Sequence, residues 1–177
     1  MQIKDYIHSY HQVITNDLAD SVINHYHTNG QWNQSSFSTN TDISPRTNNR
    51  VDMKEYWINK KDRYYEELKT GFRSMVDDYI KTHTKIIPQS FTPFRMNHYS
   101  EGGFMKNHID NIHHSHGQQY GYPHVTALLF LQTAEEGGEI VFCDGEYIPK
   151  QTKGSGVVFP SNFMFSHEVK EVIKGNR

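Results

Sequence analysis

Histidine and aspartate residues at two distant places in the chain could together hold a metal ion. His108 and Asp110 are two residues apart, so on an extended strand their side chains point the same way and can offer an imidazole nitrogen and a carboxylate oxygen to one ion. His167 lies far enough along the chain to return on a neighbouring strand. Two His and one carboxylate that leave the other positions open form the ligand set of non-haem Fe(II) oxygenases. An isolated H-x-D also occurs by chance, so the assignment needs companion residues.

Two further residues could hold a small acid beside such a metal. Arg177 follows His167 by about one strand length, and a guanidinium there can form a bidentate pair with the carboxylate of a co-substrate. Tyr99 comes shortly before His108, at the end of an expected strand, where its hydroxyl could hydrogen-bond the same acid. Tyr99 could equally be an ordinary aromatic residue of a sheet.

The first half of the chain must position these residues with helices. Apolar residues that recur every four positions predict a helix that begins near residues 15–17 and ends at Gly30. The stretch 31–52 is rich in Ser, Thr and Asn, which predicts a long loop or irregular strands, and a loop of this length can serve as a lid. A longer helix is expected over about 59–83, with one apolar face that covers a sheet.

The second half has a different pattern, with short runs of β-branched and aromatic residues between Gly-rich breaks. This spacing is typical of an all-β sandwich or barrel and does not fit a parallel α/β sheet. The predicted strands are Phe94–Tyr99, Val125–Gln132, Glu139–Phe142, Gly156–Phe159 and His167–Val172.

Length, charge and cysteine content exclude several classes of protein. With 177 residues and a net charge of -2, from 18 basic and 20 acidic residues, the chain suits one domain without an electrostatic footprint for nucleic acid or an anionic membrane. No membrane span or apolar signal stretch is visible, so we expect a soluble, cytoplasmic or otherwise intracellular protein. Cys143 is the only cysteine, which excludes intrachain disulfides and zinc sites with several thiolates. It is expected to be a small buried apolar residue.

Several segments in a specific order and spacing resemble the prolyl 4-hydroxylase branch of the Fe(II)- and 2-oxoglutarate-dependent dioxygenases. They are Tyr99-Ser100-Glu101-Gly102-Gly103, His108-Ile109-Asp110, Val125-Thr126-Ala127-Leu128-Leu129-Phe130-Leu131, Glu135-Glu136-Gly137-Gly138-Glu139, Gly156-Val157-Val158-Phe159-Pro160, His167-Glu168-Val169 and Gly175-Asn176-Arg177. The segment Ser44-Pro45-Arg46-Thr47 resembles, more weakly, an Arg-Thr segment that such enzymes carry near the substrate.

The resemblance implies roles for six residues. It implies Fe(II) as the metal, held by His108, Asp110 and His167. It implies 2-oxoglutarate and O2 as co-substrates, with ascorbate as a further cofactor. The implied contacts of 2-oxoglutarate are Tyr99, Thr126 and Arg177. Phe130 departs from the Tyr often found near this place in relatives.

The same resemblance implies a fold and an activity. The fold is a mainly β double-stranded β-helix, or jelly roll, in a single domain over 1–177, with a helical part over about 1–87 and the core over about 88–177. Relatives continue past the Arg with a final strand, so this chain is either a truncated or partly ordered version of a longer one, which we expect, or a protein that has lost its last strand and part of its activity. The implied reaction hydroxylates prolyl residues of a peptide or protein, as a procollagen-proline 4-dioxygenase does, and releases succinate and CO2.

Two other functions stay open at this point. An oxygenase acting on a free amino acid or another small molecule would carry the same ligand motif. A non-catalytic metal-binding β-barrel would bind metal without turning over 2-oxoglutarate.

Several other residues allow two interpretations of their role. His113, His114 and His116 could form a second metal site, but solvated loop residues or a substrate rim are the simpler reading. Arg46 and Arg95 are expected at the surface or against substrate. Four aromatic residues could line a dry pocket or pack in the core: Phe104, Phe130, Phe159 and Phe163.

Overall fold

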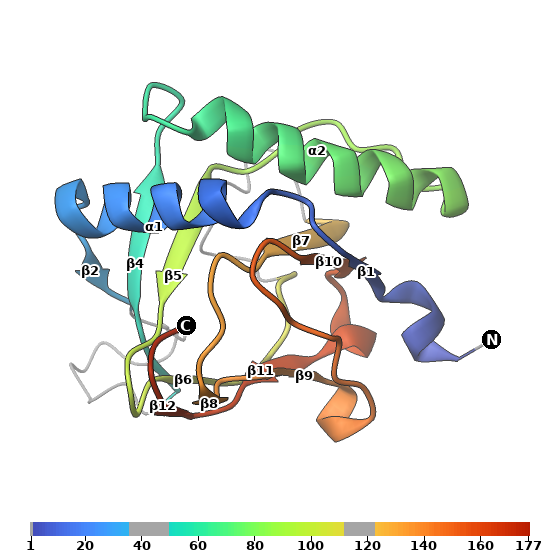
Figure 1. The fold of residues 1–177 in the computed structure, drawn as a ribbon. Coiled ribbons are helices and arrows are strands. Elements are labelled where there is room, and N and C mark those ends of the chain that lie inside the picture. The colour runs from blue at the N-terminus through green and yellow to red at the C-terminus, as the bar shows by residue number, and fades with distance from the viewer. Residues whose placement is uncertain (1, 36–49, 112–122) are drawn as a thin grey trace, which may run out of the picture.

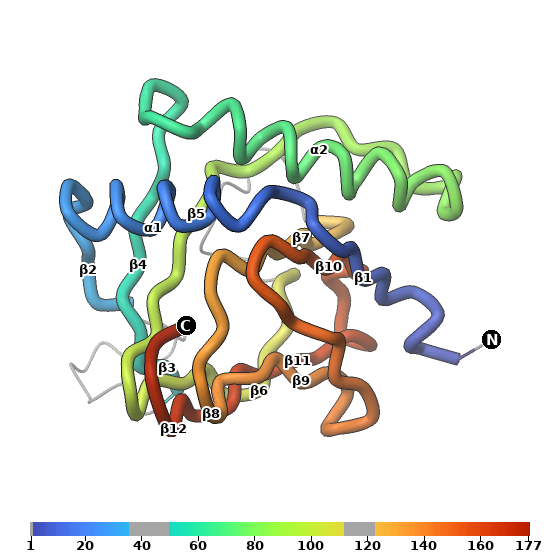
Figure 2. The backbone as a smooth tube through the Cα atoms, viewed as in Figure 1, coloured from blue at the N-terminus to red at the C-terminus, as the bar shows by residue number. Residues whose placement is uncertain are grey.

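The computed structural model describes residues 2–35, 50–111 and 123–177 and shows a mainly β protein with two long helices (Figures 1 and 2). The helices are α1 (Asn16–Asn29) and α2 (Tyr65–Thr82), with short 3-10 turns η1 (Ile3–Tyr6), η3 (Cys143–Gly145) and η4 (Phe163–Phe165). The strands are β1 (His8–Tyr10), β2 (Asn33–Gln34), β3 (Val51–Asp52), β4 (Lys54–Ile58), β5 (Phe94–His98), β6 (Phe104–His108), β7 (Val125–Leu129), β8 (Glu136–Gly137), β9 (Ile140–Phe142), β10 (Gly156–Pro160), β11 (His167–Val169) and β12 (Val172–Lys174). No helix in these ranges is both long and apolar enough to cross a membrane.

The first helix forms where the sequence pattern predicts it. Thr15 caps α1, because its Oγ1 accepts a hydrogen bond of 3.2 Å from the backbone N–H of Leu18. Gly30 ends the helix and donates its N–H to the carbonyl of Tyr26. Val22 and Tyr26 are buried on the apolar face. The predicted helix is therefore confirmed, with both its ends.

The second helix begins at Tyr65 and not near Asn59, so its predicted start is wrong. The carboxylate of Asp62 accepts hydrogen bonds of 2.9 Å from the backbone N–H of Asn59 and from the hydroxyl of Tyr56. These bonds hold the preceding residues in a turn, and Tyr64 then has a left-handed backbone with a φ of 70°. The residues from Asn59 to Tyr64, which the sequence pattern assigned to the helix, instead form this turn.

All strand pairs among the described residues are antiparallel. The strands form the orders β1-β10-β7, β3-β6-β11-β9, β12-β8 and β2-β4-β5. Figure 1 shows α1 and α2 on one side of the molecule and β6, β9 and β11 on the opposite side, with β7 and β10 between them. The prediction of a mainly β fold is confirmed.

Several strands differ from their predicted bounds. The predicted strand His167–Val172 is two strands, because β11 pairs with β6 and β9 whereas β12 pairs with β8. The predicted strand Val125–Gln132 ends at Leu129, after which the N–H of Phe130 donates to the carbonyl of Ser155. Strands β1, β4, β6 and β8 were not predicted, whereas β2 and β3 lie in the stretch 31–52, for which a long loop or irregular strands were expected. Strands β1, β3 and β4 lie before residue 87 and pair with β10, β6 and β5, so the chain's first half contributes directly to the sheets.

The aromatic residues and the cysteine divide between core and surface. Phe130 and Phe159 are buried in one apolar cluster with Phe142. Phe163 is 78% exposed, because it lies in the η4 turn outside the sheets, so neither reading of it is correct. Cys143 is half-buried and not fully buried: it starts the η3 turn and packs against the edge of the same apolar cluster.

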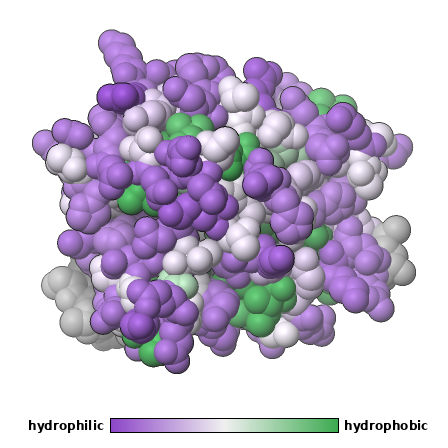
Figure 3. All heavy atoms as spheres, viewed as in Figure 1, coloured by the Kyte–Doolittle hydropathy of each residue, from purple (hydrophilic) through white to green (hydrophobic). Residues whose placement is uncertain are grey.

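The surface in Figure 3 is mostly hydrophilic, which agrees with a hydrophobic fraction of only 35%. Large apolar side chains that are exposed are spread over several elements: Ile87, Phe91, Ile148, Phe163, Met164 and Ile173.

Candidate metal centre

The pairing of β6 with β11 brings the three predicted ligands together. His108 ends β6 and lies directly opposite His167, the first residue of β11. Their ring centroids are 4.3 Å apart. Asp110 follows β6 and places Oδ1 3.6 Å from Nε2 of His108 and Oδ2 3.7 Å from Nε2 of His167. The three potential ligand atoms lie within 4.8 Å of one another.

Hydrogen bonds from the backbone orient both imidazoles. Nδ1 of His108 lies 2.9 Å from the carbonyl oxygen of Lys106, and Nδ1 of His167 lies 3.1 Å from the carbonyl oxygen of Phe165. A carbonyl oxygen only accepts, so each Nδ1 carries a proton, and in the neutral imidazole Nε2 then carries the lone pair. Both lone pairs therefore belong to the nitrogens that face Asp110, which is the orientation that metal-binding histidines need.

Burial favours the neutral form of His108, which a metal ion requires. Desolvation, followed by the neighbouring His167, lowers the pKa of His108, while Asp110 raises it to a smaller extent. A neutral imidazole is the form that binds metal. Two neutral imidazoles and one carboxylate supply two nitrogen ligands, one oxygen ligand and one negative charge. This donor set fits a divalent transition metal such as iron.

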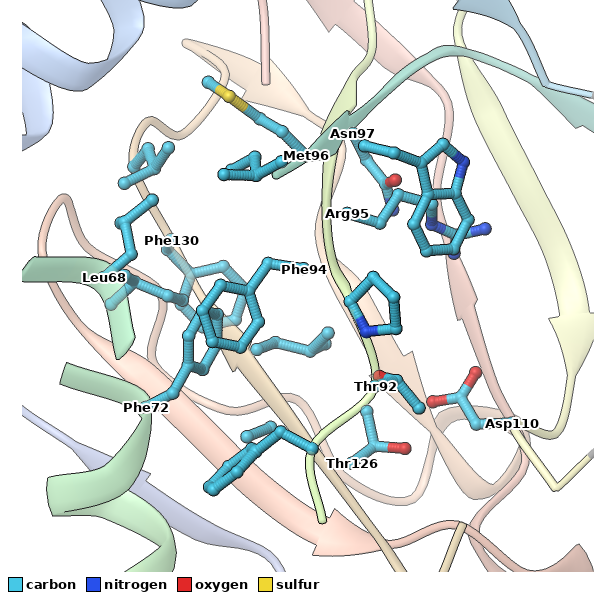
Figure 4. Close-up of a pocket in the computed structure, with 18 of the residues that line it drawn as sticks. Leu68, Phe72, Thr92, Phe94, Arg95, Met96, Asn97, Asp110, Thr126 and Phe130 are labelled. Carbon is cyan, nitrogen blue, oxygen red and sulfur yellow. The ribbon is translucent and has the colours of Figure 1, made fainter. Parts of the chain in front are cut away.

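A cavity of about 570 Å³ opens beside these residues. Its lining includes all three candidate ligands and all three predicted co-substrate contacts, namely Tyr99, His108, Asp110, Thr126, His167 and Arg177. Figure 4 shows Asp110 and Thr126 toward one end of the cavity and Leu68, Phe72 and Phe130 toward the other. The cavity therefore joins a polar end to a largely apolar wall.

Arg177 is tied to Tyr99 through the backbone. The N–H of Arg177 donates to the carbonyl of Tyr99 at 2.9 Å, and the N–H of Tyr99 donates to the carbonyl of Arg177 at 2.7 Å. The guanidinium carbon then lies 5.5 Å from the ring centroids of both Tyr99 and Phe130. Two aromatic rings thus bracket the guanidinium group.

The guanidinium of Arg177 is enclosed but has no acidic partner nearby. Its Nη2 donates to Oε1 of Gln151 at 3.3 Å, whereas its Nε is buried and unpaired. No side-chain carboxylate of the described residues lies within 4.0 Å of it. Desolvation lowers its pKa, and Tyr99 and Glu139 act in the opposite direction to a smaller extent. A buried cation without a counter-charge in contact is costly, so the site fits a ligand that brings a carboxylate.

The two residues with predicted hydroxyl contacts, Tyr99 and Thr126, both belong to the lining of the cavity. Desolvation raises the pKa of buried Tyr99, so its hydroxyl stays protonated and can donate. Oγ1 of Thr126 lies 2.9 Å from Oγ of Ser161. Both groups can hydrogen-bond an acid in the cavity.

Sequence reasoning missed two of the supporting residues. Ser161 follows β10 immediately, and its position after the Phe159-Pro160 pair was the available signal. Gln151 lies outside every strand and carries no local signal, although its side chain also accepts from the N–H of Ile140 at 3.1 Å. Four residues singled out from the sequence lie outside the described residues: Arg46, His113, His114 and His116.

A family model agrees with this arrangement. Residues 94–177 match the model described as the 2OG-Fe(II) oxygenase superfamily, where 2OG is 2-oxoglutarate. The match begins at β5 and includes all six residues above.

Known proteins resemble the chain in sequence and in fold. A PKHD-type hydroxylase of Rippkaea orientalis is 27% identical over 124 residues, which is 68% of this chain and 54% of that protein. The chain spans about half the length of the curated relatives it matches. Among solved structures, a viral collagen prolyl hydroxylase from Paramecium Bursaria Chlorella virus-1 has a TM-score of 0.72 at 16% identity, over 99% of this chain and 94% of that chain. A Pseudomonas putida prolyl-4-hydroxylase has a TM-score of 0.68 at 16% identity, over 97% and 88%.

Proposed function

We propose that this chain, which is similar in sequence to the 2OG-Fe(II) oxygenase superfamily and to PKHD-type hydroxylases and in fold to prolyl hydroxylases, is an Fe(II)- and 2-oxoglutarate-dependent dioxygenase that hydroxylates prolyl residues. The observation that carries the proposal is one arrangement of side chains. Two oriented Nε2 atoms and a carboxylate converge beside an enclosed guanidinium that has no acidic partner. A metal ion would bind the two Nε2 atoms and the carboxylate, and a dicarboxylate would pair with the guanidinium.

His108, Asp110 and His167 would hold the iron. Fe(II) bound there would supply the oxidative chemistry that consumes 2-oxoglutarate and O2, releases succinate and CO2 and hydroxylates a C–H bond. The protein's part is to bind, to orient and to exclude water. The carbonyls of Lys106 and Phe165 keep the protons on the Nδ1 atoms, so that both Nε2 atoms can present their lone pairs to the metal.

Arg177 would bind the distal carboxylate of 2-oxoglutarate, with hydroxyls of Tyr99 and Thr126 as further donors. Phe130 lies against the guanidinium where relatives often carry Tyr, and a phenyl ring cannot donate a hydrogen bond. Arg177 and Tyr99 should therefore supply most of the polar contacts at this end. Ascorbate enters the proposal through the family resemblance alone.

We assign the fold to the double-stranded β-helix. Its two sheets would be built on β1-β10-β7 and β3-β6-β11-β9, with the site between them. Thr126 on β7 and the two histidines on β6 and β11 would then approach the cavity from opposite sheets.

A prolyl residue of a peptide is the proposed substrate. Support comes from the similar prolyl hydroxylases and from a cavity whose aromatic and apolar lining suits a pyrrolidine ring. Trp57, Phe94 and Phe130 belong to that lining.

An anaerobic titration with Fe(II) and then 2-oxoglutarate tests the proposal. We expect a weak visible metal-to-ligand charge-transfer band in the native protein and its loss in His167→Ala. His11→Ala, at an exposed position on another part of the chain, is the matched control and should keep the band. Peptides that contain Pro should then stimulate 2-oxoglutarate turnover more than the same peptides with Ala.

Two other outcomes would reject parts of the proposal. Metal binding without the band would favour the non-catalytic metal-binding barrel. A band with turnover that responds to free amino acids and not to Pro-containing peptides would favour an oxygenase of small molecules.

A further inference from the structure

A second arginine faces the cavity, and the proposed reaction leaves it unused. Figure 4 shows Arg95 and Asn97 on the opposite side of β5 from Phe94 and Met96, as the alternation of a strand requires. Arg95 lines the same cavity as Asp110 and His108. Tyr99 is four residues further on, so it continues the side of the strand that carries Arg95.

Residues of β4 fix one end of the Arg95 side chain. Oε2 of Glu55 lies 3.5 Å from Nη1 of Arg95, and Oε1 of Glu55 accepts from Nε1 of Trp57 at 3.3 Å. Trp57 is the cross-strand partner of Arg95, and its ring centroid lies 5.7 Å from the guanidinium carbon. Glu55 therefore orders the tryptophan and the arginine together.

The contact with Glu55 occupies only one edge of the Arg95 guanidinium. A guanidinium has donors on three nitrogens, and Glu55 is near Nη1 alone. The Arg95 side chain is 26% exposed, whereas the Nε of Arg177 is sealed from solvent. Arg95 thus keeps donors that a molecule in the cavity can reach.

Arg95 pairs with Glu55, which lies outside the cavity lining, and no carboxylate of the described lining other than Asp110 is available to it. Among the described lining residues other than histidines, the charged side chains are Arg95, Asp110 and Arg177. In the proposed enzyme Asp110 binds the metal and Arg177 binds 2-oxoglutarate. Desolvation raises the pKa of Tyr99, and the positive charges of Arg177 and Arg95 oppose this rise, so the potential of Arg95 reaches the co-substrate wall.

We propose that Arg95 is a specificity-determining residue that binds a carboxylate group of the substrate, with Glu55 and Trp57 holding it in position. This inference rests on the proposed function, because it assigns the substrate class of the same cavity. The carboxylate is either an acidic side chain near the target residue of a peptide or the acid of a free amino acid. A charge-assisted hydrogen bond from the guanidinium favours an acidic substrate over its neutral or basic counterpart about tenfold or more.

Equilibrium binding in the anaerobic Fe(II) and 2-oxoglutarate complex tests the inference without relying on turnover. The probes are labelled, blocked Pro-containing peptides that carry Glu, Gln or Lys at each neighbouring position in turn. We expect the native protein to bind a Glu peptide about tenfold more tightly than its Lys counterpart. Arg95→Gln should abolish this preference, and Arg95→Glu should reverse it. The exposed Arg73, outside the cavity lining, provides the matched control Arg73→Glu, which should keep the native preference.

A double variant separates recognition from folding. Glu55→Gln with Arg95→Gln removes both charges, so no unpaired carboxylate remains to disturb β4, and it should still lose the preference. Competition by free glutamate in the native protein but not in Arg95→Gln would also support the inference and would identify a small acid as the source of the carboxylate.

Three results would overturn the inference. They are the absence of any acidic preference in the native protein, a preference that survives Arg95→Glu, and loss of the charge-transfer band in Arg95→Gln. The last result would place the guanidinium on the co-substrate. An acidic preference that depends on Arg95 in a protein without turnover would instead uphold this site and reject the proposed hydroxylase.

Discussion

At the scale of single residues, the candidate site depends on groups that orient one another. His108 and His167 face Asp110 with the correct nitrogen because main-chain carbonyls receive the protons of the other nitrogens. Arg177 is placed by two backbone hydrogen bonds with Tyr99. The geometry is therefore built before any ligand binds, which lowers the entropic cost of binding.

Removing one metal ligand should abolish the metal centre. In His108→Ala or Asp110→Ala we expect Fe(II) affinity to fall by at least about 100-fold, because even outer partners of metal ligands are worth about 10–100-fold. Turnover should be lost together with binding. Equilibrium metal binding measures the effect, with exposed Glu146→Ala as control. Turnover like that of the native protein in either variant would contradict the ligand assignment.

Removing the guanidinium of Arg177 should affect the co-substrate and not the metal. We expect Arg177→Ala to need about 10- to 100-fold more 2-oxoglutarate, the worth of a charge-assisted bidentate pair. Arg177→Lys should recover part of the loss, because lysine keeps the charge without the planar fork. The 2-oxoglutarate dependence of the charge-transfer band reports the change. An unchanged dependence would rule out this role for Arg177.

At the scale of elements, close packing between α2, β7 and β10 supports the cavity wall. Gly156 of β10 lies under α2, and a Cβ built there would be 2.3 Å from Sδ of Met75 and 2.8 Å from the carbonyl oxygen of Leu128. Met75 can move, but the β7 backbone is held by its pairing with β10. The strand and the helix therefore approach as closely as a glycine allows.

Adding one methyl group at this contact should destabilise the protein. We expect Gly156→Ala to lower the free energy of unfolding by about 1–3 kcal/mol, as overpacking does. Urea unfolding measures it. Gly102→Ala is a useful comparison, because nothing lies within 4 Å of that Cβ and only the left-handed backbone, with a φ of 80°, opposes it. Equal midpoints for Gly156→Ala and the native protein would show that β10 can move away from α2.

At the scale of the whole molecule, several histidines are partly buried in different places. Desolvation is the largest cause that lowers the pKa of His83, His98 and His108, followed in each case by a neighbouring histidine: His8, His27 and His167. Each group is then neutral in the folded protein at a pH where it is protonated in the unfolded chain.

The metal-free protein should consequently lose stability in mild acid. Below the ordinary histidine pKa of about 6.5, the unfolded state binds more protons than the folded state, so the free energy of unfolding falls as pH falls. Urea unfolding at pH 7.5 and pH 5.5 measures this difference, and His83→Gln should make it smaller. Exposed His11→Gln should leave it unchanged. Equal or greater stability at the lower pH would contradict the burial argument.

The sequence alone was sufficient for features that depend on neighbours along the chain. The cap at Thr15, the period of the apolar residues of α1 and the stop at Gly30 act within a few residues, so they can be read from a local pattern. The order and spacing of motifs also identified His108, Asp110, His167, Tyr99, Thr126 and Arg177, all of which line one cavity. Their chemical roles stay predictions.

Only the tertiary structure decided which distant groups meet. The register that sets His167 opposite His108, the carbonyls that receive their Nδ1 protons, and the contacts of Gln151 with Arg177 are set by how the elements pack. The same holds for the Glu55, Trp57 and Arg95 cluster between β4 and β5. Such contacts depend on strand register, where a shift of one residue turns every side chain to the other face, and no local pattern specifies that register.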